Sequence, residues 1–444
     1  MGHINDWVSI VDSTPPGPRP RVVIVGGGFG GVAAVRALKH ADAEILLIDR
    51  RNHHVFQPLL YQVATAVLSP SEVAAPLRQL AQQHRNLSVL MAEVSNINLA
   101  TKQLTASPPG LSARTISFDY LVVAPGAHPT YFGHDEFAAY APSLKTLTDA
   151  EVMRTRILSA YELAEQTDDP EVRSQALTFV LVGAGPTGVE LAASLAQMAR
   201  ITLRSNFRRI NPQETRILLI EGTKRVLPSF DGSLSDKVLH HLQQLGVEVR
   251  TGVMVEHVDE KGVVVGGERI GSNTVLWTAG VQASAIVKQL GVATDRAGRV
   301  NVGPLLSLAN HPEVFVIGDA AVATQDGHPL PGLAQVATQE GRFVGRVIDA
   351  QIRGHQVVKA FRYHDRGTMA VVGKNFAVLQ RGRLHLSGFL SWLLWALVHV
   401  MFLPQLQNRV RVQVQWLWSY LTGQRSSRLI PEPRPAEGIT SGTG

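Results

Sequence analysis

Val22-Val-Ile-Val25-Gly26-Gly-Gly28-Phe-Gly-Gly31 is the stretch that decides the fold. The apolar run before the glycines is β-branched and too short for a helix, so it predicts a buried parallel strand. We expect Gly26 to allow a tight turn, Gly28 to admit a pyrophosphate and Gly31 to let the next helix pack on the strand. Asp49 ends the following strand eighteen residues after Gly31, where a carboxylate binds an adenosine ribose. A glycine-rich surface turn is the alternative, but strand, helix and acid in register favour a dinucleotide site.

The same pattern recurs in the middle of the chain. Thr178-Phe-Val-Leu-Val182 reads as another buried strand, and three spaced glycines follow it, namely Gly183, Gly185 and Gly188. The acid comes late: Glu221 ends the next strand thirty-three residues after Gly188, because a polar, basic insertion at 204–214 precedes that strand. A carboxylate here favours NADH over NADPH, although the neighbouring Lys224 and Arg225 weaken that preference. The sequence therefore predicts two nucleotide sites.

Composition limits the chemistry that these sites can support. The 444 residues, 45% of them hydrophobic, suggest two to three domains, and there is no cysteine. Disulfides, thiolate metal sites, iron–sulfur clusters and dithiol relays are therefore excluded. His53 and His54 lack partners at ligand spacing, so a structural role is favoured and no metal site is expected. Redox work then needs a bound cofactor.

Two nucleotide sites without a thiol suggest that one cofactor gives a hydride and that a flavin accepts it. Glu190 lies in the first turns of the second helix, where it either complements the helix dipole or acts near a nicotinamide. Asp319 follows the buried strand 313–317 and is expected to hold a ribityl or ribose hydroxyl; the alternative is that it caps the next helix. Gly126 follows a buried strand and is expected to bring the backbone close to a ligand.

Residues 330–430 contain the candidates that would contact a third partner. Gln335 and Gln339 lie four residues apart on one face of an expected helix, where amides suit a quinone carbonyl or a flavin edge. An ordinary polar helix surface is the alternative. Lys374 lies in a turn between two expected short strands, where it would place positive charge near a reduced flavin; a solvated turn lysine is an equal alternative.

The apolar stretch 388–403 precedes a segment with apolar residues at helical spacing, namely Val410, Val414, Leu417 and Leu421. Sixteen residues of helix rise only about 24 Å, less than the roughly 30 Å of hydrocarbon, so the stretch is expected to lie in a membrane interface and not to cross it. Nearby tryptophans and arginines fit such an anchor, with a buried helix or a dimer interface as the alternative. From residue 351 onward twelve Lys and Arg stand against three Asp and Glu. Their alternation with apolar stretches favours a membrane over nucleic acid.

Taken together, these motifs resemble the type II NADH:quinone oxidoreductases, within the superfamily of FAD- and NAD-linked, disulfide-reductase-like flavoproteins. The resemblance covers about residues 21–430 and is carried by Phe56-Gln-Pro-Leu-Leu-Tyr-Gln-Val-Ala-Thr65, Leu276-Trp-Thr-Ala-Gly280, Gly318-Asp319 and Ala334-Gln-Val-Ala-Thr-Gln-Glu340. It implies FAD in the first site, NADH in the second and Glu190 near their meeting point. The family's AQxAxQE-like motif lies at the flavin and quinone site and maps onto Gln335 and Gln339 here. We expect Gln57, Gly280 and Ala334 to bind a cofactor as well. The related sulfide:quinone oxidoreductases need redox cysteines, which this chain lacks.

We therefore expect an α/β flavoprotein with two Rossmann-like dinucleotide-binding domains plus C-terminal amphipathic membrane-anchoring helices. The expected segments are a disordered arm (1–20), an FAD-binding domain in two parts (21–148 and 296–360), an inserted NAD(H)-binding domain (149–295), a membrane-anchoring and quinone-site region (361–430) and a disordered tail (431–444). The expected reaction passes two electrons from NADH through FAD to a membrane quinone without ion pumping. We expect a homodimer, peripheral or monotopic, at the cytoplasmic face of the inner (plasma) membrane.

Two alternatives stay open for the function. One is an NADPH-preferring quinone reductase that serves quinone biosynthesis. The other is a slow-turnover membrane flavoprotein that acts as a sensor or scaffold. The sequence leaves the quinone open among the menaquinone, ubiquinone and plastoquinone classes.

Overall fold

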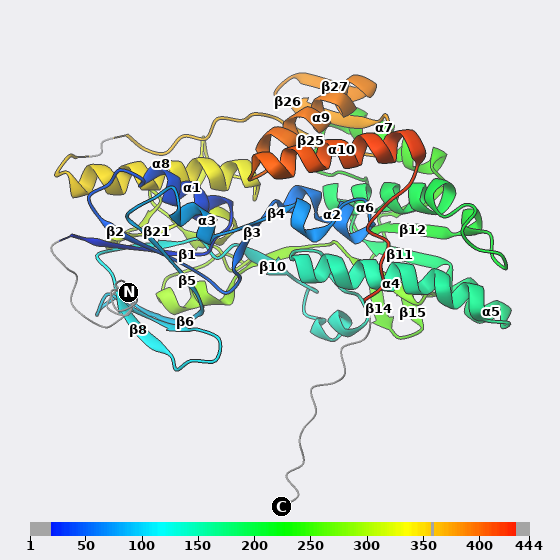
Figure 1. Cartoon of the computed structure of the whole chain (residues 1–444), viewed down its shortest axis with the longest axis horizontal. Coiled ribbons are helices and arrows are strands. Elements are labelled where there is room, and N and C mark those ends of the chain that lie inside the picture. Colours follow the sequence, from blue (N-terminus) through cyan, green and yellow to red (C-terminus); the bar gives the residue numbers. More distant parts are fainter. Residues whose placement is uncertain (1–18, 357–358, 432–444) are drawn as a thin grey trace, which may run out of the picture. The chain divides into compact units, whose positions relative to one another are not determined.

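The computed structural model describes residues 19–356 and 359–431. The chain forms two compact units, each made of separate segments (Figure 1). Within the described residues, the first unit contains the chain up to 56, 74–130 and 280–366, and the second contains 57–73, 131–279 and the chain from 367 onward. The expected disordered segments 1–20 and 431–444 lie outside the described residues, apart from positions 19, 20 and 431. The chain changes unit at 130 and 279, not at the expected 148 and 295, because β10 (Ala127–Pro129) and β18 (Val281–Ala283) pair antiparallel inside the first unit.

The first unit is built on a six-stranded sheet in the order β20-β21-β9-β1-β2-β5. Its neighbouring strands are parallel except at the edge, where β20 runs antiparallel to β21. All five residues of β1 are buried, as the apolar run predicts for a central strand. The bounds are β1 (Arg21–Val25), β2 (Glu44–Asp49), β5 (Leu87–Met91), β9 (Tyr120–Val123), β20 (Ser307–Leu308) and β21 (His311–Val316).

Smaller elements complete the first unit. A three-stranded antiparallel sheet consists of β6 (Glu93–Asn98), β7 (Gln103–Ser107) and β8 (Arg114–Ser117). The remaining pairs and short helices are β3 (His53–Val55), β4 (Ala74–Pro76), α3 (Arg78–Ala81), η6 (Ala285–Leu290), β19 (Val300–Asn301), η7 (Gly318–Ala320), β22 (Ala321–Val322), β23 (Thr324–Gln325) and β24 (His328–Pro329).

Two helices of the first unit, α1 (Phe29–Ala37) and α8 (Ala334–Ile352), lie against each other at unusually close range (Figure 1). A Cβ on Gly341 would lie only 2.1 Å from the carbonyl oxygen of Gly30. One turn further along, a Cβ on Gly345 would lie 2.6 Å from the Cβ of Ala37. The two backbones therefore approach as far as they do because both helices present residues with little or no side chain.

The second unit repeats the parallel design in a four-stranded sheet, in the order β13-β12-β11-β17. Its strands are β11 (Thr178–Val182), β12 (Arg216–Glu221), β13 (Val247–Thr251) and β17 (Thr274–Trp277). Its helices are α4 (Leu147–Gln166), α5 (Pro170–Ala176), α6 (Pro186–Gln197) and α7 (Gly232–Gln244), and an antiparallel sheet adds β14 (Val255–Asp259), β15 (Gly262–Val265) and β16 (Glu268–Gly271). The two parallel sheets confirm the predicted α/β class with two Rossmann-like folds.

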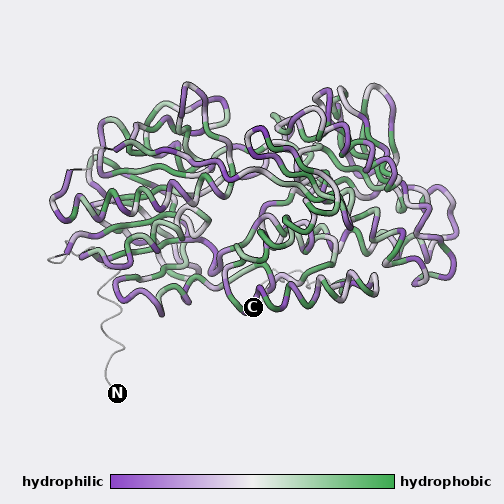
Figure 2. The backbone as a smooth tube through the Cα atoms, turned by 90° about the horizontal axis from the view of Figure 1, so that it is seen from above, coloured by the Kyte–Doolittle hydropathy of each residue, from purple (hydrophilic) through white to green (hydrophobic). Residues whose placement is uncertain are grey.

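The C-terminal part of the chain packs into this second unit. An antiparallel sheet of β25 (Thr368–Val371), β26 (Ala377–Arg381) and β27 (Leu384–Gly388) leads to α9 (Phe389–Phe402) and α10 (Leu406–Thr422). Figure 2 shows that hydrophobic stretches run through both units. Within residues 19–356 and 359–431, no helix combines the length and the apolar composition that crossing a bilayer requires.

The segment 57–73 also belongs to the second unit, which the sequence did not reveal. It forms η1 (Gln57–Leu59), α2 (Leu60–Ala64) and η2 (Pro70–Glu72). Asn408 of α10 donates hydrogen bonds to the carbonyl oxygens of Ser71 and Glu72, at 3.2 and 2.9 Å. The indole nitrogen of Trp416 donates to the side-chain oxygen of Gln62 at 2.6 Å. These side chains of α10 fix the segment.

We predict that Gly341→Ala destabilises the protein by about 1–3 kcal/mol, because the new methyl group forces α8 away from α1. This loss would occur although alanine has the higher helix propensity, by about 1 kcal/mol. Urea unfolding of the holoprotein measures the effect. The exposed neighbour Arg342 supplies the control, since Arg342→Ala should change stability by less than about 0.5 kcal/mol. Equal stability of the Gly341 variant and the wild type would contradict the close packing.

Candidate functional site

The first glycine turn has the geometry that its three glycines predict. Gly26 adopts φ +105°, and a Cβ there would lie 2.1 Å from the carbonyl oxygen of Ala124. A Cβ on Gly31 would lie 1.8 Å from the carbonyl oxygen of Gly26, so only glycine lets α1 begin this close to β1. Gly28 is exposed, and nothing lies within 4 Å of the place where its Cβ would be. This open backbone at the start of α1 has room for a phosphate group.

Asp49 fastens this turn from the end of β2. One carboxylate oxygen accepts the backbone N–H of Gly27 at 2.7 Å, and the other accepts the N–H of Arg51 at 2.8 Å. Each carboxylate oxygen has two acceptor sites, so Asp49 retains the capacity to accept ribose hydroxyls. His54 supports the same turn, since its Nδ1 lies 2.9 Å from the carbonyl oxygen of Gly27 and burial is the main cause that lowers its pKa to about 4.

The second turn reproduces this arrangement in the other unit. Gly183 has φ +101°, a Cβ on Gly188 would lie 1.8 Å from the carbonyl oxygen of Gly183, and the Cβ position of Gly185 is open. Glu221 accepts the backbone N–H of Ala184 at 2.7 Å and that of Thr223 at 2.8 Å. The insertion at 204–214 therefore delays the acid along the chain without changing its bonding; its last residues form η5 (Pro212–Glu214) shortly before β12.

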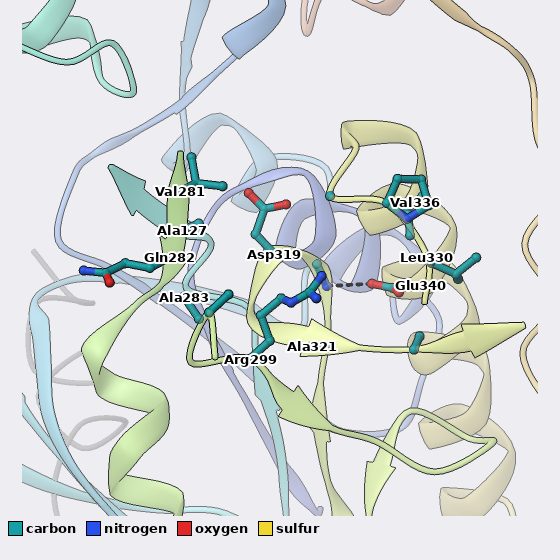
Figure 3. A pocket seen from close by; sticks show the side chains of 15 residues that line it. Ala127, Val281, Gln282, Ala283, Arg299, Asp319, Ala321, Leu330, Val336 and Glu340 are labelled. Atoms are coloured by element: carbon teal, nitrogen blue, oxygen red, sulfur yellow. Dashed lines mark hydrogen bonds between the residues drawn. The ribbon is translucent and has the colours of Figure 1, made fainter. Parts of the chain in front are cut away.

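A cavity of about 270 Å³ in the first unit is lined by one of the predicted residues, Asp319, and by the neighbours of two others (Figure 3). Asp319, from η7, lines it, as do Ala127 and Val281, the residues that follow Gly126 and Gly280. Both of those glycines have positive φ, +72° and +70°. The alternative that Asp319 caps a helix is wrong, because Ile317 precedes η7 and Leu333 precedes α8.

Glu340 lines the same cavity, and sequence reasoning gave it no role of its own (Figure 3). It is 2% exposed, and its carboxylate accepts the backbone N–H of Gly318 at 2.6 Å. The pKa of Glu340 is raised to about 7, mainly by burial and to a smaller extent by the neighbouring Asp319, although the hydrogen bond from Gly318 acts in the opposite direction. Glu340 thus holds the backbone that presents Asp319. Its place at the end of the Ala334–Glu340 motif was the available signal.

Gln335 and Gln339 lie on one face of α8, as their spacing predicts, and both bind the chain that follows α8. Gln339 exchanges two hydrogen bonds with the backbone of His364, donating to its carbonyl and accepting its N–H, each at 3.0 Å. The side-chain oxygen of Gln335 accepts the N–H of Arg366 at 3.3 Å. Ala334 is the first residue of α8. The two amides therefore hold residues 364–366 against this end of the helix.

The remaining predicted residues, Glu190, Lys374 and Gln57, belong to the second unit. Glu190 is 8% exposed, its carboxylate accepts the N–H of Val371 at 3.4 Å, and burial raises its pKa to about 8. The helix-dipole alternative is wrong, because the first turn of α6 contains no acidic residue. Lys374 donates to the carbonyl oxygen of Tyr420 at 2.9 Å and lies 3.9 Å from the centre of its ring, so it holds the end of α10. Gln57 is exposed at the start of η1.

Comparison with known proteins gives consistent matches. The family model of the pyridine nucleotide-disulphide oxidoreductases matches residues 20–341. Two proteins of Mycobacterium tuberculosis, the type II NADH:quinone oxidoreductases Ndh and NdhA, are each 41% identical to this chain, over 94% and 93% of it and 91% and 90% of their own lengths. The solved structure of NDH2 from Plasmodium falciparum in complex with NADH superposes with a TM-score of 0.84, covering 92% of this chain and 99% of that one, at 18% identity.

We predict a specific pH dependence of stability from Glu190. Its pKa in the folded protein, about 8, lies above the 4.5 of an ordinary glutamate, so the folded state retains a proton that the unfolded chain releases between these values. Stability therefore falls as pH rises through this window. Relative to Glu190→Gln, the wild-type holoprotein should lose roughly 3–5 kcal/mol of unfolding free energy between about pH 5 and 8.5.

Denaturant unfolding at several pH values measures this difference. Glu260, exposed in the same unit, provides the control, because Glu260→Gln should follow the wild-type profile. A Glu190→Gln variant whose stability also follows the wild-type profile would show that Glu190 titrates as an ordinary glutamate.

Proposed function

The chain belongs to the type II NADH:quinone oxidoreductases, an enzyme family of flavoproteins, and we propose that its first unit holds FAD and its second unit holds NADH. The enzyme transfers electrons from NADH to a quinone. Bound FAD would supply the chemistry that links the two substrates, namely acceptance of a hydride from NADH and release of two electrons to the quinone. The observation that carries the assignment of both units is the duplicated arrangement in which a strand-end acid fastens a glycine turn.

In the first unit, separate residues match the successive parts of an FAD molecule. The open turn at Gly28 would receive the pyrophosphate and Asp49 the adenosine ribose. Asp319 would accept a ribityl hydroxyl in the cavity that it lines. The other FAD contacts proposed in the first unit are Gly26, Gly31, Gly126, Gly280, Ala334 and Gln335. Gln57, whose proposed role rests on the resemblance alone, belongs to the second unit. The backbone at Gly31 leaves no room for a Cβ, and a side chain at Gly28 would occupy the open space beside the turn. Both features fit a bound FAD.

For NADH, the proposed contacts are Gly183, Gly185, Gly188 and Glu221. The carboxylate of Glu221 already accepts two backbone N–H groups, and its remaining lone pairs suit a ribose hydroxyl. A 2′-phosphate would place negative charge beside this carboxylate, which favours NADH. Kinetics with NADH and NADPH side by side distinguish this proposal from the NADPH-preferring reductase.

For the quinone, we assign Gln335 and Gln339 a positioning role, because their amides bind the backbone of 364–366. Quinone reduction consumes two protons with two electrons. Glu190, with its pKa raised to about 8, is largely protonated at neutral pH and so can hold a proton. Its proposed place is near the meeting point of nicotinamide and flavin. We expect Lys374 to contribute through α10, whose end it holds.

We further propose that the second unit rests on the cytoplasmic surface of the inner (plasma) membrane through α9 and α10. Twelve large apolar side chains of these two helices are more than half exposed, namely Phe389, Leu390, Leu393, Leu397, Met401, Phe402, Leu406, Val410, Val414, Leu417, Trp418 and Leu421. Such a surface is much larger than isolated exposed apolar residues. The 14 residues of α9 rise only about 21 Å, which suits an interfacial position. A homodimer is proposed as well, and sedimentation in detergent tests it.

We predict that Gln339→Ala impairs quinone reduction at least about tenfold more than it impairs reduction of the flavin by NADH, because it releases residues 364–366 from α8. Anaerobic stopped-flow absorbance follows bleaching of the flavin after NADH and its recovery after a soluble quinone. Arg346→Ala, on the exposed face of α8, should leave both steps unchanged. Equal losses in both half-reactions would refute the assignment, and bleaching without recovery in the wild type would refute the quinone role.

We also predict that Leu397→Asp lowers binding to anionic lipid vesicles about tenfold or more, since a buried leucine contributes about 1.5–3 kcal/mol and the new charge must stay in water. Co-sedimentation with vesicles measures it. Leu111→Asp makes the same change at a similarly exposed position of the first unit, 61% against 56%, and should bind like the wild type. Equal binding by all three proteins would contradict membrane attachment through α9.

A further inference from the structure

A second cavity, of about 470 Å³, lies in the second unit beside the segment that follows α10. Its lining includes the apolar residues Leu158 of α4, Leu203, Phe207, Trp418 of α10, Leu429 and Ile430. Neither the nucleotide turns nor the glutamines of α8 contribute to it, so the reaction proposed above leaves this cavity without a role.

The lining of the cavity also contains a buried arginine, Arg425, that has no carboxylate partner. Arg425 is 5% exposed and donates to the carbonyl oxygens of Thr65 and Ser194, at 2.8 and 2.9 Å. Both acceptors are neutral. Burial lowers the pKa of Arg425 to about 10, and the positive charge of Arg428 adds to that effect. A buried charge that lacks an opposite charge carries a large desolvation cost.

Arg428 brings a second guanidinium group to the same place. Its Nε donates to the carbonyl oxygen of Arg425 at 3.0 Å, and a terminal nitrogen donates to the side chain of Gln424 at 3.3 Å. Among the residues that the structure describes, neither arginine forms an ion pair with an acidic side chain. The cavity lining has one carboxylate, that of the exposed Glu162. The two arginines and this one carboxylate leave the cavity lining with a net charge of +1.

We propose that this cavity binds the phosphate group of a phospholipid, with the start of an acyl chain against the apolar residues that line it. Arginines are the preferred partners of phosphate oxygens, because the planar guanidinium matches their geometry. The volume lies in the usual range for small-ligand pockets, about 300–1,000 Å³. Trp418 lines the cavity from α10, the helix assigned above to the membrane surface. The source of the lipid thus rests on the proposed membrane attachment, whereas the binding chemistry does not.

The test uses the holoprotein in detergent, stripped of lipid. Calorimetric titration with dihexanoyl phosphatidylglycerol, below its micelle concentration, should give saturable binding to one site. Inorganic phosphate and dihexanoylglycerol should each bind about tenfold or more weakly, because each offers only half of the required contacts. Arg428→Ala should weaken lipid binding about tenfold. Arg411→Ala removes the same charge from the exposed face of α10 outside the cavity and should have no effect.

Three results would overturn the proposal: no saturable binding of the lipid, inorganic phosphate binding as tightly as the lipid, or equal weakening by the two arginine variants. The variant at Arg428 is chosen because Arg425 also holds α2 and α6 together through its two carbonyl contacts. Circular dichroism should confirm that both variants are folded. The monomeric lipid is measured without vesicles or substrates, so failure here is distinguishable from failure of membrane attachment or of quinone reduction.

Discussion

In the first turn of the helix that follows each glycine turn, two backbone segments lie so close that a Cβ would not fit, and much of the architecture depends on this contact. In each parallel sheet the third glycine of the turn lies so near the first glycine's carbonyl oxygen that a Cβ would be 1.8 Å away. In the first unit the approach continues outward, since Gly341 of α8 lies against Gly30. A chain of backbone contacts therefore leads from β1 through α1 to α8 and determines where Glu340 and the two glutamines stand.

The strand-end acids connect this packing to chemistry. Asp49 and Glu221 each hold the residue that follows the first glycine of its turn, so each turn is fixed before any ligand arrives. Glu340 does the same for the backbone of Gly318. Carboxylates that hold backbone N–H groups in place thus recur at three sites where a cofactor hydroxyl or phosphate is proposed, which reduces the ordering that binding would otherwise require.

Local patterns were enough to predict both parallel sheets, both glycine turns and their acids, because strand, turn and helix are set by residues within a few positions of each other. Contacts between distant segments were not predictable in this way. No local pattern indicated that Lys374 would bind Tyr420, that Gln339 would bind the backbone of His364, or that 57–73 would join the second unit. The capping role considered for Asp319 failed for the same reason, since it depended on where α8 begins.

The interleaving of the two units along the chain has a consequence for biosynthesis. The four-stranded sheet of the second unit uses strands between residues 178 and 277, so it is complete within one stretch of emerging polypeptide. In the first unit, β9 can pair with β21 only much later in synthesis, because the first residue of β21 follows Val123 by almost two hundred positions. Non-local pairing of this kind is slow because the long loop must close first. A ribosome would therefore release a finished second sheet while β9 still exposes an unpaired edge, which a chaperone would have to cover.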